Sequence, residues 1–230
     1  MHKKKQIAEM FDKIAGKYDF MNHLLSFRVH VLWRKKAVAL LKYNSPKKIL
    51  DVATGTGAFA ISAMKLNPEK ITGIDISEEM MKVGREKIKN KKFQDRIELM
   101  KGDSENLPFE ENSFDAITVG FGVRNFENLE KGLNEMHRVL KPNGKVVVLE
   151  FSKVKSFPLK QLYNLYFRFI TPAIGKLFAK DKTAYSYLPE SVSAFPDGED
   201  FRTILKQRGF RETKCYPLTF GIASIYTGIK

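Results

Sequence analysis

The 230-residue chain contains one cysteine and four histidines, and this scarcity excludes several kinds of site. Cys215 has no partner for an internal disulfide, and a metal site built from several cysteines is excluded. His2, His23 and His137 do not have the spacing of metal ligands. We therefore expect no metal, and the cysteine content fits a reducing compartment.

Long apolar runs are also missing. None reaches the ~18 residues of a membrane-spanning helix, and residues 1–6, Met-His-Lys-Lys-Lys-Gln, lack the apolar core of a signal peptide. Acidic residues are few, since 26 Asp and Glu stand against 40 Lys and Arg, for a formal net charge of +14. That charge indicates nucleic acid or an anionic membrane face as a partner, or only a solvated surface. The sequence predicts a cytoplasmic protein.

The most informative stretch is Ile49 to Ala60, Ile-Leu-Asp-Val-Ala-Thr-Gly-Thr-Gly-Ala-Phe-Ala. A short apolar run, an acid and two alternating glycines predict a buried strand, a tight turn and the start of a helix. The glycines let the backbone approach a ligand closely. The expected ligand contacts here are Asp51, Gly55, Thr56 and Gly57. A second apolar run, residues 71–76, carries Asp75, which is placed to bind a ribose, so we expect a nucleoside cofactor.

The acid before the glycines bears on which cofactor binds. A dinucleotide brings a pyrophosphate, which favours backbone N–H donors without a carboxylate beside them. Asp51 stands four residues before Gly55, and it suits a ligand with an ammonium and a sulfonium, which describes S-adenosylmethionine. A dehydrogenase that binds NAD and an incidental strand-turn-helix remain open alternatives, because the glycine pattern alone is weak evidence.

The rest of the chain alternates strands with helices. Further strands are expected at residues 97–103, 113–122 and 145–151, with a closing pair at 213–218 and 221–228. Helices are expected from Ser77, over 129–140 with a stop at 141–144, and over 199–208. The fold class is therefore α/β, a Rossmann-like, mostly parallel sheet of seven strands with helices on both faces. Its ligand should lie across the carboxyl ends of the strands.

We expect one domain over residues 1–230, with four parts. Residues 1–45 form an N-terminal helical cover, with an amphipathic helix at 7–22 and a second helix at 24–41, and residues 46–151 form the cofactor-binding core. Residues 152–196 form an aromatic insertion, which serves the substrate or a membrane interface, or alternatively is a helix buried in the core. Within it, 157–179 is dense in aromatics and 185–196 is a loop-rich connector. Residues 197–230 form a closing helix and hairpin.

Two more strand ends carry candidate site residues. Asp103 and Ser104 follow the third strand, where a side chain can hydrogen-bond the edge of an adenine. Gly120 lies at the end of the fourth strand and is expected to contact the cofactor. The chain then runs directly into Arg124 and Asn125, beside the position expected for a transferred methyl group.

The motifs together resemble the ubiquinone and menaquinone biosynthesis C-methyltransferase family, within the class I S-adenosylmethionine-dependent methyltransferases. The resemblance covers nearly the whole chain. It is carried by Tyr18–Asn22 with Leu24–Phe27 and Trp33, Asp51–Gly57, Gly102–Phe109, Phe121–Asn125, Arg138–Pro142, Leu149–Ser152, Tyr187–Ser191 and Ala194–Pro196. The chain departs from the family at Thr54, where a glycine is common, at Ala58, where an acid is common, and at Asp103-Ser104, where Asn-Ala is common. These departures concern individual cofactor contacts.

The resemblance implies transfer of a methyl group from S-adenosylmethionine to a ring carbon of a polyprenylated quinol. It implies conversion of demethylmenaquinol to menaquinol, with 2-polyprenyl-6-methoxybenzoquinol of ubiquinone biosynthesis as an alternative or second substrate. A prenylated substrate implies peripheral association with the anionic inner face of the cell membrane, and no nucleic-acid partner. A homodimer is compatible with the resemblance.

An ionised quinol attacks the methyl group through its own ring carbon, so no enzyme nucleophile is needed. Arg124 is expected to stabilise the anionic oxygen, with Asn125 and Tyr18 as hydrogen-bonding partners. The alternative for Arg124 is a structural role in holding a loop through carbonyl groups. His30 is a further candidate to accept the proton, against a packing role. An RNA methyltransferase, a dehydrogenase and a scaffold without activity are the rival functions.

Overall fold

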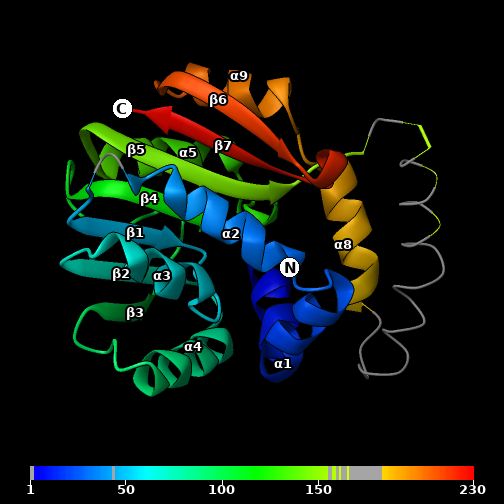
Figure 1. Cartoon of the computed structure of the whole chain (residues 1–230), viewed down its shortest axis with the longest axis horizontal. Helices are drawn as coiled ribbons and strands as arrows, with labels where there is room; N and C mark the ends of the chain where they lie inside the picture. The colour runs from blue at the N-terminus through cyan, green and yellow to red at the C-terminus, as the bar shows by residue number, and fades with distance from the viewer. Residues whose placement is uncertain (1–2, 43–44, 155–156, 159–160, 162–164, 166–182) are drawn as a thin grey trace.

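A seven-stranded sheet forms the centre of the computed structural model, which describes residues 3–42, 45–154, 157–158, 161, 165 and 183–230 (Figure 1). The strands lie in the order β3-β2-β1-β4-β5-β7-β6. Their bounds are β1 Lys48–Val52, β2 Lys70–Asp75, β3 Ile97–Lys101, β4 Phe114–Gly120, β5 Leu140–Phe151, β6 Arg211–Leu218 and β7 Ala223–Ile229. The pairings among β1 to β5 are parallel, and β7 is antiparallel to both β5 and β6. This confirms the predicted fold class.

Helices cover both faces of the sheet, because successive strand residues point to opposite sides. Ile49 belongs to the core beneath α2 (Val29–Ala39), α3 (Ala58–Ala63) and α4 (Glu78–Asn90). The next residue, Leu50, belongs to the core beneath α5 (Leu129–Val139) and α9 (Glu199–Gln207). A short 3₁₀ helix, η2 (Met64–Leu66), extends α3. Each face of β1 is thus buried, as expected for a parallel sheet between helices.

The first helix crosses the edge of the sheet at which the parallel strands end (Figure 1). α1 (Lys3–Leu25) packs against α4, and a turn at residues 26–28 leads into α2. The predicted helical cover is therefore present. α1 begins four residues earlier than expected and continues to Leu25, so the second helix begins at Val29 and not at residue 24. Ile7, Ala15 and Met21 are its buried residues.

The expected loop at 185–196 is wrong, because this stretch forms most of α8 (Thr183–Ala194). Pro189 lies inside the helix, although a proline removes one backbone hydrogen bond there. Ser191 and Val192 of the helix are buried, and Phe195 just beyond it is only 3% exposed. Packing of these residues outweighs the local preference of Pro and Ser for a loop.

The expected stop at 141–144 is also wrong in part. α5 ends at Val139, close to the prediction, but β5 begins directly at Leu140. Leu140 pairs with Phe114, and the register then shifts so that Lys145 pairs with Ala116. The Asn143 amide donates to the Lys230 carbonyl at 3.0 Å, and the Lys230 amide donates to the Gly144 carbonyl at 3.1 Å. The Pro-Asn-Gly stretch is thus an irregular part of the strand, held by the end of the chain.

Much of the predicted aromatic insertion lies outside the described residues. Of 157–179, the structure describes Phe157, Pro158, Gln161 and Leu165. The predicted closing helix and hairpin are present as α9, β6 and β7, with the 3₁₀ helix η5 (Thr219–Gly221) between the two strands. Among the described residues, no helix has the length and apolarity to cross a membrane.

Asp51 is fully buried between β1 and the loop that follows it. Its Oδ1 accepts a hydrogen bond from Thr118 on the paired strand β4 at 2.7 Å, and its Oδ2 accepts one from Thr54 at 2.6 Å and one from the Ala60 amide at 3.2 Å. Burial raises the pKa of Asp51 to about 6, although these donors and Arg34 favour the charged form. The acid therefore ties the glycine loop to the sheet.

The raised pKa of Asp51 predicts a stability that falls as the pH rises. Between its ordinary pKa of 3.8 and about 6, the folded state keeps a proton that the unfolded state has lost. The free energy of unfolding should therefore fall by about 3 kcal/mol across this window because of Asp51 alone, and this contribution should stay level at higher pH. Urea unfolding of the wild type and of Asp51→Asn should show this difference in pH dependence. Parallel pH profiles for the two proteins would contradict it.

Candidate functional site

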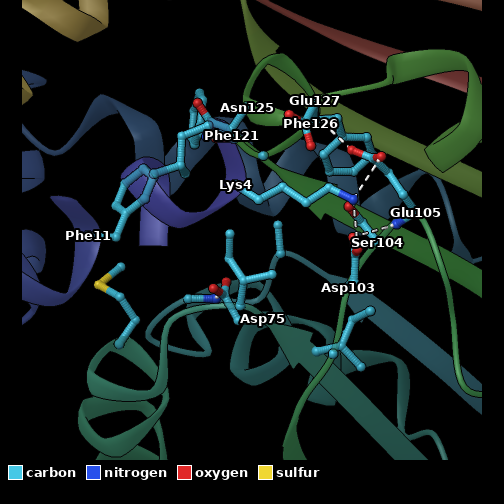
Figure 2. Close-up of a pocket in the computed structure, with 18 of the residues that line it drawn as sticks. Lys4, Phe11, Asp75, Asp103, Ser104, Glu105, Phe121, Asn125, Phe126 and Glu127 are labelled. Atoms are coloured by element: carbon cyan, nitrogen blue, oxygen red, sulfur yellow. Dashed lines mark hydrogen bonds and ion pairs between the residues drawn. The ribbon is translucent and has the colours of Figure 1, made fainter. Parts of the chain in front are cut away.

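A cleft lies at the carboxyl ends of β1 to β4, beneath α1 (Figure 2). Its lining combines carboxylates with apolar side chains, which suits a small-molecule ligand. Seven of the residues predicted from the sequence line it, namely Tyr18, Gly55, Asp75, Asp103, Ser104, Gly120 and Asn125. Four predicted residues are not among its lining, namely Asp51, Thr56, Gly57 and Arg124. The structure thus brings the four expected strand ends together. The other four predicted residues do not line the cleft that these strand ends form.

The glycine loop turns between β1 and α3 with two left-handed residues. Gly55 has φ +53° and Gly57 has φ +69°, a conformation that favours glycine. Gly57 is the N-cap of α3 and lies behind the loop. The Thr56 hydroxyl donates to Asp19 of α1 at 2.8 Å and accepts from Lys87 at 2.9 Å. Gly55 is therefore the part of the loop that faces the cleft, while Thr56 fastens the loop to α1 and α4.

Asp75 stands at the end of β2 and faces the cleft (Figure 2). One of its oxygens accepts from the Gly55 amide at 2.8 Å and the other from the Ser77 amide at 2.9 Å. Burial raises its pKa, and these amides oppose that shift. A carboxylate accepts about four hydrogen bonds, so both oxygens keep lone pairs that can accept the two hydroxyls of a ribose.

Asp103 marks the end of β3 and is joined to α1 by Lys4 (Figure 2). The Lys4 ammonium lies 2.7 Å from Asp103 and 2.9 Å from Glu105. Burial alone would raise the pKa of Asp103, but hydrogen bonds from Lys4 and the Glu105 amide lower it below its usual range. Glu105 also accepts from the backbone amides of Glu127 and Asn128. Lys4 and Glu105 were not predicted from the sequence, because their roles depend on a contact across 99 positions.

Apolar side chains supply much of the remaining lining. Ile7 and Phe11 come from α1, Met80 from α4, and Phe121 and Phe126 from the residues after β4. Only the helical spacing of Ile7, Phe11 and Tyr18 in the sequence points to this face of α1. Aromatic rings beside carboxylates suit a ligand with a flat, apolar ring and polar hydroxyls.

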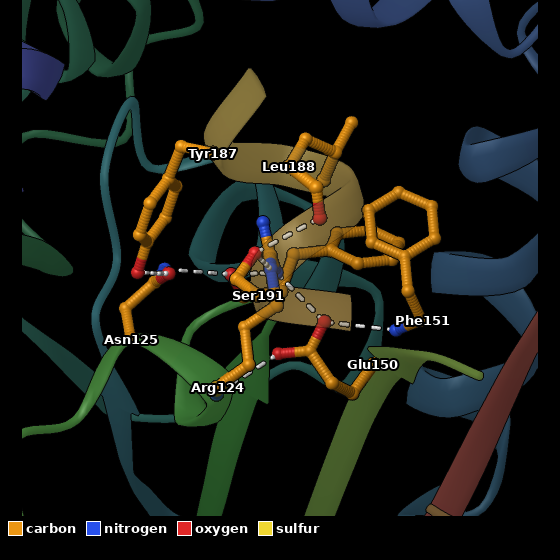
Figure 3. Close-up of polar contacts among 8 residues, drawn as sticks. Arg124, Asn125, Glu150, Phe151, Tyr187, Leu188 and Ser191 are labelled. Atoms are coloured by element: carbon orange, nitrogen blue, oxygen red, sulfur yellow. Dashed lines mark hydrogen bonds and ion pairs between the residues drawn. The ribbon is translucent and has the colours of Figure 1, made fainter. Parts of the chain in front are cut away.

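Arg124 is buried against Glu150 rather than exposed in the cleft (Figure 3). Its Nη1 lies 2.7 Å from Glu150 Oε1 and donates to the Phe121 carbonyl at 2.6 Å, and its Nε donates to Ser191 at 3.3 Å. The side chains of Arg124 and Glu150 are 6% and 0% exposed. Burial raises the pKa of Glu150, and Arg124 opposes that shift. The pair holds the turn after β4 against β5 and α8.

Asn125, next to Arg124, does reach the cleft. Its Oδ1 accepts a hydrogen bond from the Tyr187 hydroxyl of α8 at 2.9 Å (Figure 3). Tyr18 lines the cleft from α1, and burial raises the pKa of its hydroxyl, whereas the nearby charge of Arg124 lowers it. Tyr187 and Asn125 thus meet at the end of β4. The charge of Arg124 acts on the hydroxyls of both Tyr18 and Tyr187, and Glu150 opposes it at Tyr187. Tyr187 was part of a motif in the sequence but was not predicted as a site residue.

His30 is buried in α2 and is not among the residues that line the cleft. Its Nδ1 lies 2.5 Å from the Ser26 hydroxyl, and burial lowers its pKa to about 4, with Arg34 as a further cause. His30 is therefore neutral near pH 7. No cluster of three or more His, Cys, Asp or Glu that suits a metal occurs in the part of the chain that the structure describes.

Comparisons with known proteins agree on one family. The model of the ubiE/COQ5 methyltransferase family matches residues 1–230. A demethylmenaquinone methyltransferase from Bacteroides fragilis is 48% identical over 229 residues, which are 99% of this chain and 94% of the relative. The ubiquinone/menaquinone biosynthesis C-methyltransferase UbiE from Geotalea daltonii is 46% identical over 230 residues, 99% of this chain and 97% of the relative.

A solved structure of an S-adenosylmethionine-dependent methyltransferase from Aquifex aeolicus has a TM-score of 0.58 and 22% identity, and covers 80% of this chain and 81% of that one. That likeness supports the fold alone. The match along the whole length and the high identity to curated relatives carry the assignment. The chain belongs to the ubiE/COQ5 methyltransferase family.

Proposed function

We propose that the protein transfers a methyl group from S-adenosylmethionine to a ring carbon of a polyprenylated quinol and thereby converts demethylmenaquinol to menaquinol. The observation that carries this proposal is the 48% identity, over nearly the whole chain, to a protein named demethylmenaquinone methyltransferase. The cleft supports it, because its lining includes a carboxylate, aromatic rings and a glycine of the loop after β1, which suit a nucleoside with an amino-acid tail.

The donor contacts follow from the cleft. Asp75 would accept the ribose hydroxyls, and Asp103 with Ser104 would bind the adenine edge between Phe11 and the end of β3. The amino-acid end would lie over Gly55, near Gly120. Asp51, Thr56 and Gly57 lie behind this surface, so we propose that they contribute by holding the loop in shape.

The acceptor contacts are proposed at the end of β4. An ionised quinol raises the electron density on its neighbouring ring carbon. That carbon forms a bond to the methyl carbon as the bond from methyl to sulfur breaks, and the ring then loses its proton. Asn125 and Tyr18 would hydrogen-bond the quinol oxygen. Arg124, whose side chain is 6% exposed, would supply positive charge. Arg124 reaches the oxygen directly only if the Glu150 pair opens, so its effect is first an electrostatic one.

A second acceptor is supported by the naming of relatives. The relative from Geotalea daltonii is named for both ubiquinone and menaquinone biosynthesis. Methylation of 2-polyprenyl-6-methoxybenzoquinol, alone or beside demethylmenaquinol, is therefore the alternative. Peripheral binding to an anionic membrane at the cytoplasmic face belongs to the same proposal, because a prenylated quinol resides in the bilayer. A homodimer remains a prediction from the resemblance.

Methyl transfer from labelled S-adenosylmethionine to chemically reduced demethylmenaquinol tests the proposal, with reduced polyprenyl methoxybenzoquinol in parallel. Turnover of the first alone indicates a menaquinone enzyme, and turnover of both a dual one. Thermal shift with S-adenosylmethionine and with NAD provides the control for the donor. A melting temperature raised by S-adenosylmethionine without turnover of either quinol would reject the acceptor and keep the donor.

Asp75→Ala should raise the KM for S-adenosylmethionine by about tenfold to a hundredfold, because a charge-assisted hydrogen bond to the ribose is lost. Asp115→Ala is the matched control. Asp115 also accepts from two backbone amides, those of Lys47 and Lys48, but does so at the start of β4. Equal KM values for the two variants would remove Asp75 from the donor site.

Arg124→Ala should lower kcat by about a hundredfold at an unchanged KM for the donor, because positive charge near the quinol oxygen is lost. It should also destabilise the fold by about 3 kcal/mol, since Glu150 is left buried and unpaired. Glu150→Gln separates the two effects, because it keeps the charge of Arg124 and disturbs the same pair. If both variants lose kcat equally, Arg124 acts through packing and not through its charge.

A further inference from the structure

Exposed apolar side chains gather around α2. Among the described residues, the most exposed include Phe27 at 79%, Phe220 at 74% and Leu32 at 55%. Phe27 lies in the turn before α2, Leu32 is on α2, and Phe220 lies in η5. The Trp33 indole donates to the Thr219 hydroxyl at 2.8 Å, which joins the middle of α2 to η5. This contact brings η5, which contains Phe220, against α2, although 193 positions lie between Phe27 and Phe220 in the sequence.

The exposed face of α2 is basic. Arg28, Leu32, Lys35 and Lys36 follow one another at spacings of four, three and one, which puts them on one side of the helix. All four are exposed, whereas His30, Trp33, Ala37 and Val38 on the other side are buried. Within the described part of the chain, none of the three basic residues is in an ion pair. Leu32 thus lies among three cations, and Phe27 and Phe220 belong to the same region. This combination suits a partner surface that is both anionic and apolar.

Both exposed phenylalanines are held in an unfavourable backbone conformation. Phe27 and Arg28 have φ values of 47° and 64°, and Thr219 and Phe220 have 45° and 57°. Two consecutive non-glycine residues in the left-handed region cost energy at each place. Neither phenylalanine contributes burial in return, because both point into solvent. An apolar partner outside the protein would supply that burial.

This surface connects with the cleft through aromatic rings. Trp33 of α2 packs against Phe121 with ring centroids 6.3 Å apart, and Phe121 packs against Phe151 at 4.6 Å. Phe121 also lines the cleft. Packed aromatic side chains thus extend from the lining of the cleft toward α2 and η5, at the edge of the sheet where α1 and the β6–β7 connection lie (Figure 1).

We infer that Phe27, Arg28, Leu32, Lys35, Lys36 and Phe220, here named the α2 surface, dock on an anionic phospholipid bilayer. The phenylalanines and Leu32 enter the interface, and the three cations contact lipid phosphates. The tail of a prenylated substrate then passes along Trp33 and Phe121 without leaving an apolar environment. The docking names the surface for the membrane binding in the proposed function and rests on that part of it, whereas the passage of the tail also rests on methyl transfer to a prenylated quinol.

Charge reversal at the α2 surface tests the docking. The variant R28E/K35E/K36E should bind vesicles of equimolar phosphatidylglycerol and phosphatidylcholine at least about tenfold more weakly than the wild type in a sedimentation assay. Its matched control is K89E/K91E/K92E, which changes the net charge equally. These exposed lysines lie at the end of α4, which leads to the opposite edge of the sheet. Equal losses in both variants would overturn the proposal, as would a wild type that does not bind.

The apolar part has its own test. F27S/F220S should weaken vesicle binding about tenfold, with Tyr216→Ser as the control at an exposed ring of β6. Turnover of a quinol without a prenyl tail should stay at the wild-type level in F27S/F220S.

If wild-type protein binds vesicles but methylates no quinol, the proposed function fails and the docking stands. If F27S/F220S instead converts a dimer to a monomer and keeps full vesicle binding, the surface is a contact between copies and the proposal is overturned.

Discussion

The parallel sheet imposes one constraint on everything around it, because β1, β2, β3 and β4 all end at the same edge. Backbone amides at strand ends need acceptors once they are buried. Three acids provide them. Asp51 accepts from the Ala60 amide, Asp75 from those of Gly55 and Ser77, and Asp103 from that of Glu105. The acidic residues that mark the strand ends in the sequence are thus the same residues that hold the loops around the cleft in place.

Asp51 and Glu150 are both buried, and different partners offset the free-energy cost of burying their charges. Asp51 has hydroxyl and amide donors, and its pKa rises to about 6. Glu150 has the guanidinium of Arg124 at 2.7 Å. A buried pair of this kind costs much when one partner is removed and contributes little net stability when intact. Its main effect here is geometric, since it fixes the turn that brings Asn125 to the cleft.

The sequence predicted the sheet, the glycine loop and most of the strand-end residues because those follow from local patterns. Alternating strands and helices imply a parallel sheet, and a parallel sheet brings its strand ends together. Contacts between distant segments left no such pattern. Lys4 meets Asp103 across 99 positions, and Tyr187 meets Asn125 across 62. α8 was missed for the related reason that Pro189 favours a loop locally, whereas packing of Ser191 and Val192 decides in favour of a helix. Arg124 was expected beside the transferred methyl group, but it pairs with Glu150 and does not line the cleft, and the sequence pattern did not predict that partner.

The position of α1 has a consequence for the order in which the chain folds. Its polar contacts include those with Thr56, Ser77, Asp103 and the Phe126 carbonyl, so it meets the ends of four successive strands. The last of these partners lies 123 positions further along the chain. α1 is synthesised before these partners, so it has no complete docking surface until β4 and the turn after it have been made. Closure of the cleft therefore depends on contacts of large sequence separation, whose formation costs more loop-closure entropy than that of local contacts.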